Sequence, residues 1–202
     1  MNLNIPYMET DNKLLNDAYR IAAGDIVGNI VYYQNGLLTE EKPCMIAGLD
    51  YNTPWTRDTA INIWNALSIL SPEVSKNTLL AVLEEEEGNI YIGGQYWDSI
   101  IWMIGAREYC RFHKDDNFYR LAFEAGRNSV HRLEEDEFDE EDGLFRGPAV
   151  YGDGIAAYPD KYSKCPNQGS GILEWVDYPG NPVYPKGYGI PMKALSTQLR
   201  LF

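Results

Sequence analysis

The sequence contains few of the residues that build metal sites and disulfide frameworks. Among its 202 residues are only three cysteines, Cys44, Cys110 and Cys165, and two histidines. The cysteines lie far apart and form no Cys-x-x-Cys pair, so the spacing that a zinc site or a dense disulfide framework needs is missing. We therefore expect free thiols, no metal and no other cofactor.

Basic residues are also scarce relative to acidic ones. The chain carries 17 Lys and Arg against 30 Asp and Glu, which gives a formal net charge of -13. A surface of this sign repels phosphate backbones and anionic lipids, so nucleic acids and membranes are not expected partners. Neutral or cationic ligands are left.

Long apolar runs are missing as well. No stretch approaches the roughly 18 uninterrupted apolar residues that mark a membrane span. The first residues, MNLNIPYMETDNKLLND, lack the basic start and apolar centre of a signal peptide. We therefore expect a cytoplasmic protein without a membrane-spanning segment.

What the sequence does contain is apolar residues at helical spacing. With 45% hydrophobic and 13% aromatic residues, the chain can close the core of a single domain over residues 1–202. Apolar side chains recur every three or four positions in residues 11–33, 56–70, 73–84, 96–112 and 116–133. Asp11 is the expected cap of the first segment. The sequence predicts an all-α fold.

The connections between these helices differ greatly in length. The turns at Ser71 and Pro72 and at Lys114 and Asp115 are short, as between antiparallel neighbours, and each closes a helical hairpin. Long connections occupy residues 34–54, 85–95 and 134–193. In an up-and-down array these three emerge at one end, so we expect them to share one face, with the longest as a cover over it.

Two of these connections end with aromatic rings beside carboxylates. Tyr51, Trp55 and Asp58 stand at the end of the first, and Trp97 and Asp98 at the end of the second. An aromatic ring can stack on the apolar face of a sugar while a carboxylate accepts hydrogen bonds from its hydroxyls, which favours a carbohydrate ligand. The alternative is that both aspartates only stabilise helix N-termini and that both tryptophans belong to the core.

The tryptophans also indicate a repeat. Trp55 and Trp97 lie 42 residues apart, and each is followed by an aspartate at a helix start. Such a repeat is typical of a toroid or solenoid of helical hairpins. Two further tryptophans, Trp64 and Trp102, lie inside helices, where we expect them in the core.

Arg57 directly precedes Asp58. As a surface ion pair the two would contribute little, but at the floor of a cleft they could clamp adjacent sugar hydroxyls, the cation donating and the carboxylate accepting. The stretch YNTPWTRD, residues 51–58, resembles the aromatic-x-Arg-Asp signature of six-hairpin glycosidases with an (α/α)6 barrel, such as glucoamylases and glycogen-debranching glucosidases. The resemblance implies that Arg57 and Asp58 hold the non-reducing-end sugar.

A later stretch, residues 142–159, looks like the Gly-Leu…Asp…Tyr-Pro segment of processing α-glucosidases and, more loosely, of trehalases. In those families the aspartate is the general acid, so the resemblance gives that role to Asp153. We expect Arg146 and Tyr151, from the same stretch, to bind substrate. The alternative is that Gly-Asp-Gly at residues 152–154 only forms a turn, since these residue types are common in turns.

The acidic runs at residues 84–87 and 134–142 are typical of solvated surface, so neither is expected to supply catalysts.

Six hairpins of this length would need about 250 residues, so the resemblance implies an incomplete (α/α)6 toroid. Its apolar helix faces would be exposed, which favours homo-oligomers. In the families that the sequence resembles, the general base is a glutamate of the C-terminal half. No residue of this chain matches it, Glu174 included.

The expected function is that of a glycoside hydrolase which acts on a glucoside or short oligosaccharide by acid-assisted, inverting hydrolysis. The alternative is a truncated fragment that binds carbohydrate without turnover. A third hypothesis is a helical scaffold for protein partners with no sugar site.

Overall fold

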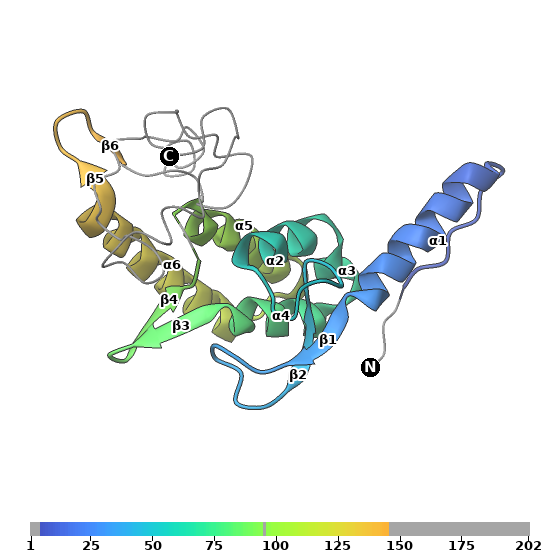
Figure 1. The fold of residues 1–202 in the computed structure, drawn as a ribbon, viewed down its shortest axis with the longest axis horizontal. Helices are drawn as coiled ribbons and strands as arrows, with labels where there is room; N and C mark the ends of the chain where they lie inside the picture. Colours follow the sequence, from blue (N-terminus) through green and yellow to red (C-terminus); the bar gives the residue numbers. More distant parts are fainter. Residues whose placement is uncertain (1–4, 95, 146–202) are drawn as a thin grey trace.

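The structure is a computed structural model, and it describes residues 5–94 and 96–145 (Figure 1). The helical elements are α1 (Lys13–Gly28), α2 (Thr56–Asn62), the π-helical turn η1 (Ile63–Leu67), α3 (Ser68–Leu70), α4 (Pro72–Ala81), α5 (Trp97–His113) and α6 (Asp116–Glu137). The strands form three antiparallel pairs: β1 (Ile30–Tyr33) with β2 (Lys42–Met45), β3 (Leu83–Glu86) with β4 (Asn89–Ile92), and β5 (Phe138–Asp139) with β6 (Leu144–Phe145).

The described chain is mostly helical, but the three strand pairs correct the all-α prediction. β1 and β4 are rich in β-branched and aromatic residues, which fit a pleated and half-buried surface. Between β3 and β4, Glu87 and Gly88 both have positive φ, 53° and 80°. A two-residue loop of this kind is the preferred connection of a β-hairpin, and it lies in the long connection predicted over residues 85–95.

The first helix is shorter than predicted at both ends. Its cap is Asn12 and not Asp11, because the Asn12 side chain accepts hydrogen bonds from the backbone N–H groups of Leu14 and Leu15 at 3.0 and 3.3 Å. The helix ends at Gly28, and the residues up to Tyr33 pair with β2 instead of continuing the helical period.

Two helical hairpins follow, as predicted. α2, η1 and α3 form one continuous helical stretch that turns at Ser71 and Pro72 into α4. α5 turns into α6 at Lys114, whose φ of 48° gives the left-handed conformation that often ends a helix. α2 and α5 pack side by side with their N-termini at the same end. The helices of the described part do not close a ring.

The core lies between these hairpins. Trp102 is fully buried, packs against Phe118 with ring centroids 6.3 Å apart, and donates its indole N–H to the carbonyl of Leu79 at 3.3 Å. The prediction for Trp102 is therefore confirmed. The prediction for Trp64 is wrong, because its side chain is 46% exposed. The stretch from α2 to α3 has apolar residues on two sides, and the side that carries Ile63 is the one that faces inward.

None of the described helices combines the length and the hydropathy of a membrane-spanning segment. Arg146, Tyr151 and Asp153, with most of the long connection predicted over residues 134–193, lie outside the described residues.

Candidate functional site

The N-termini of α2 and α5 meet through two polar contacts. The hydroxyl of Thr56 donates to the carbonyl of Gly93 at 2.7 Å, and both residues are buried. In the first turns of the two helices, Nη1 of Arg57 on α2 lies 3.2 Å from Oδ1 of Asp98 on α5. Two of the three segments that we expected to share one face are thus brought together.

The Arg57–Asp98 ion pair is largely shielded from solvent. The exposed fraction is 19% for the Arg57 side chain and 7% for that of Asp98. Removing either partner from such a pair leaves an uncompensated charge, which costs more than the pair itself contributes. The pair therefore ties the start of α2 to the start of α5.

This pairing extends the Arg-Asp motif to the next hairpin. The sequence suggested that Arg57 acts with its neighbour Asp58, and the structure adds an ion pair between Arg57 and Asp98 of the next hairpin. Asp58 remains in the first turn of α2, where a carboxylate interacts favourably with the helix dipole.

In the loop before α5, the backbone at Gly94 passes very close to the side chain of Asp98. Gly94 has a φ of +117°, and a Cβ there would lie 2.8 Å from Cβ and 2.9 Å from Oδ2 of Asp98. Tyr96, which precedes α5, has a φ of 37°, a strained conformation for a residue other than glycine. Strain of this kind clusters at functional sites. Thr56, Gly93 and Gly94 were missed by the sequence interpretation, although the Gly-Gly pair before a helix start was an available signal.

The two tryptophans of the repeat differ in their surroundings. Trp55 is 42% exposed and Tyr51 is 50% exposed, and their rings meet edge to face with centroids 6.3 Å apart. Trp97 is only 8% exposed and packs against Ala60 and Ile101. The rings before α2 can offer a face to a ligand, whereas Trp97 is a core residue, as the alternative interpretation had it.

Trp97 nevertheless retains a polar group. Its indole Nε1 is buried and has no hydrogen-bond partner in the part of the chain that the structure describes. Buried donors of this kind are rare and call for an explanation, such as a bound ligand or a water molecule. The atom belongs to the first residue of α5, next to Asp98.

The end of α6 adds a carboxylate that the sequence interpretation had dismissed. Glu134, Glu135 and Glu140 are exposed, as expected for a solvated run, but Glu137 is only 3% exposed. Because α5 and α6 form an antiparallel hairpin, the end of α6 lies toward the start of α5. Continuing the helical period of α6 beyond Leu133 would have placed Glu137 on its inner face.

Neither described thiol has the character of a nucleophile. Cys44 and Cys110 are free, and burial raises the pKa of Cys44 to about 12. Burial, and then the charge of Asp115, raises the pKa of Cys110 as well. A thiol must ionise to react. Among residues 5–94 and 96–145, no group of three or more His, Cys, Asp or Glu side chains is placed to hold a metal ion.

Comparisons with protein-family models, with curated proteins and with solved structures found no match. The resemblance of residues 51–58 and 142–159 to six-hairpin glycosidases therefore stays a hypothesis from motifs.

Proposed function

We propose that the chain is a glycosidase-like domain that binds a glucoside or short oligosaccharide at the joined N-termini of α2 and α5. The observation that supports this most is the shielded Arg57–Asp98 ion pair only two residues after the exposed ring of Trp55. A cation and a carboxylate held together beside an aromatic face match the donors, acceptors and apolar face of a sugar.

In this proposal each group has a separate role. Arg57 donates hydrogen bonds to the hydroxyls of the terminal sugar, and Asp58 and Asp98 accept them. The ring of Trp55, held edge to face by Tyr51, stacks on the apolar side of the sugar. Trp97 acts differently from the sequence expectation: it packs α5 against α2 and offers only its indole N–H to the ligand.

Hydrolysis is the second part of the proposal, and it depends on Asp153. The protonated carboxyl of Asp153 gives its proton to the glycosidic oxygen as the bond to the anomeric carbon breaks. A water molecule adds to that carbon and loses its proton to a second carboxylate, which in an inverting enzyme lies about 6.5–9.5 Å from the acid. Because no residue matches the base of the resembled families, binding without turnover is the second candidate function.

Binding is tested by calorimetric titration with maltose, isomaltose and trehalose. We expect Trp55→Ala to weaken binding of the preferred sugar by about tenfold, which corresponds to the loss of roughly 1.4 kcal/mol of stacking. Trp64→Ala is the matched control, because Trp64 is 46% exposed in the helical stretch that Trp55 directly precedes, and Trp55 is 42% exposed. No binding of any sugar, or equal losses in both variants, would contradict the proposal.

Hydrolysis is tested with 4-nitrophenyl glucosides and the same disaccharides. We expect slow product formation that Asp153→Asn abolishes while sugar binding persists. Sugar binding in the intact chain without any product would favour the non-catalytic candidate. Product formation that survives Asp153→Asn would remove Asp153 from the mechanism.

A further inference from the structure

α1 projects from the rest of the molecule in Figure 1. Of its side chains only Asn16 is buried, and Ile26, near its C-terminal end, is the α1 residue that packs against the main core. The first turns of this helix therefore stand clear of the two hairpins.

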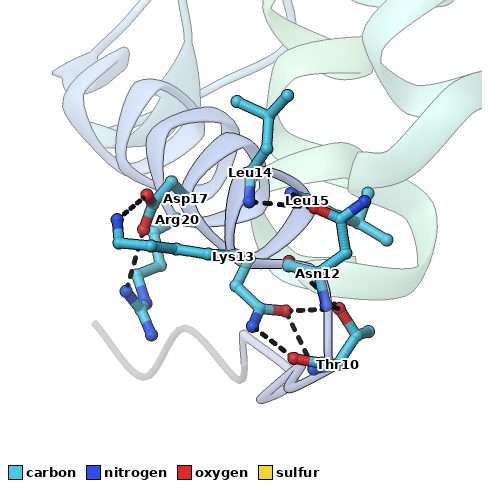
Figure 2. A network of polar contacts seen from close by, with 8 residues as sticks. Thr10, Asn12, Lys13, Leu14, Leu15, Asp17 and Arg20 are labelled. Atoms are coloured by element: carbon cyan, nitrogen blue, oxygen red, sulfur yellow. Dashed lines mark hydrogen bonds and ion pairs between the residues drawn. The ribbon is translucent and has the colours of Figure 1, made fainter.

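One side of α1 is covered by the segment that precedes it. The side chain of Asn16 donates to the carbonyl of Thr10 at 2.8 Å and accepts from the backbone N–H of Thr10 at 2.9 Å. The hydroxyl of Tyr19 donates to the carbonyl of Pro6. Figure 2 shows the contacts around Thr10 and Asn12 that hold the helix start in place. The projecting part is thus ordered by its own chain.

The opposite side of α1 carries an apolar stripe formed by Leu14, Ala18 and Ile21. Steps of four and three residues place these side chains on one side of the helix, away from Asn16. Leu14 is 78% exposed and Ile21 is 65% exposed. A continuous exposed stripe on an ordered helix marks an interaction surface more strongly than scattered exposed residues do.

The charges on α1 indicate what covers the stripe. The helix carries two cations, Lys13 and Arg20, and two anions, Asp17 and Asp25, so its net charge is zero in a chain of net charge -13. Membrane-binding helices usually have Lys and Arg in excess on their polar side, and α1 has no such excess. Two copies of this acidic chain would repel each other least if they met at this neutral helix.

We propose that α1 pairs with α1 of a second copy in antiparallel orientation. Leu14 then packs against the partner subunit's Ile21 across the two Ala18 side chains. The antiparallel orientation places the two acidic bodies at opposite ends, whereas a parallel pair would bring them together.

The test is sedimentation velocity of the full chain over a range of protein concentrations. Two short helices bury an area at the low end for specific interfaces, so we expect a weak dimer that dissociates on dilution. Ile21→Lys should weaken the dimer at least tenfold. Ile69→Lys is the matched control, because Ile69 is 60% exposed on α3 and Ile21 is 65% exposed, and it should leave the dimer unchanged.

A charge exchange tests the orientation. Leu14→Glu alone should weaken the dimer, and the double variant Leu14→Glu, Ile21→Lys should restore it. In the antiparallel pair each new glutamate lies against a new lysine of the partner helix, whereas in a parallel pair the like charges would meet. A chain that is monomeric at every concentration, or a dimer indifferent to Ile21→Lys, would overturn the proposal. So would binding to phosphatidylcholine vesicles that Ile21→Lys abolishes, since the stripe would then be a lipid-binding surface.

Discussion

Gly94 shows at the scale of one residue how the site depends on close approach. Its φ of +117° is a conformation that residues with a side chain rarely adopt, and a Cβ at this position would meet Cβ and Oδ2 of Asp98 within 3 Å. Asp98 is the residue that pairs with Arg57. Any side chain at position 94 must therefore shift either the loop or the carboxylate.

We expect Gly94→Ala to lower the free energy of unfolding by about 2–3 kcal/mol, from the combined cost of backbone strain and displacement of Asp98. Urea denaturation measures this change. Gly88→Ala is the control, because Gly88 also has positive φ, +80°, but its added Cβ would meet nothing within 4 Å. It should lose only about 1 kcal/mol. If both variants lose the same free energy of unfolding, the close contact with Asp98 contributes nothing to the loss.

Sequence patterns predict single residues only where local spacing decides their position. Burial of Trp102 follows from its place in a helix of uniform apolar period. The ion pair between Arg57 and Asp98 could not be predicted in this way. Asp98 lies 41 positions away in the chain, and the contact depends on how α2 packs on α5. The contrast between Trp55 and Trp97 has the same origin, since only packing determines which of two similar motifs is buried.

At the scale of elements, the helices were predicted and the strands were not. A period of three to four residues repeated over many residues identifies a helix, but four-residue strands such as β1 are too short to show their own period. Ile30 continued the spacing of the preceding helix and was therefore assigned to it. The Glu-Gly turn between β3 and β4 places a glutamate at positive φ, which its residue type does not indicate.

Asp115 joins three elements at the turn between α5 and α6. Its Oδ1 accepts from the backbone N–H of Phe118 at 3.0 Å and so caps α6. Its Oδ2 lies 2.6 Å from Nζ of Lys76 on α4 and accepts from the Tyr109 hydroxyl at 3.5 Å. The hydrogen bond from Lys76, followed by that from Phe118, lowers the pKa of Asp115 below its ordinary value of 3.8. Burial, and then Asp115, raises the pKa of Tyr109 to about 12.

The lowered pKa predicts a pH-dependent contribution to stability. Because the carboxyl binds its proton less readily in the folded than in the unfolded chain, its charge stabilises the fold fully above about pH 4. This contribution is lost as the pH falls through the lowered pKa. We expect Asp115→Asn, which keeps a capping side chain, to cost about 0.5–1 kcal/mol at pH 7 and progressively less below pH 4.

Urea denaturation of both proteins between pH 7 and pH 2.5 measures the difference. Glu40→Gln is the control, since Glu40 pairs with Lys42 on an exposed surface and its removal should have no measurable effect. A loss in Asp115→Asn that is constant over the whole pH range would show that the charge of Asp115 contributes nothing to the fold.

At the scale of the whole molecule, the excess of carboxylates works against the compact state. Thirty acidic and 17 basic residues give the net charge of -13, so like-charge repulsion outweighs attraction over distances beyond the individual ion pairs. The β3–β4 turn concentrates this repulsion, because Glu85 and Glu87 are both exposed there beside Glu86, which pairs with Arg132.

Added salt should therefore stabilise the fold, because it screens the repulsion between these carboxylates. The screening length falls from about 30 Å at 0.01 M salt to about 10 Å at 0.1 M, so we expect the free energy of unfolding in urea to rise by about 1 kcal/mol between 0.01 and 0.5 M sodium chloride. The double variant Glu85→Gln, Glu87→Gln should be more stable than the parent chain at low salt and should respond less to added salt. A free energy of unfolding that falls with salt in the parent chain would show instead that ion pairs such as Arg57–Asp98 and Lys76–Asp115 outweigh the net repulsion.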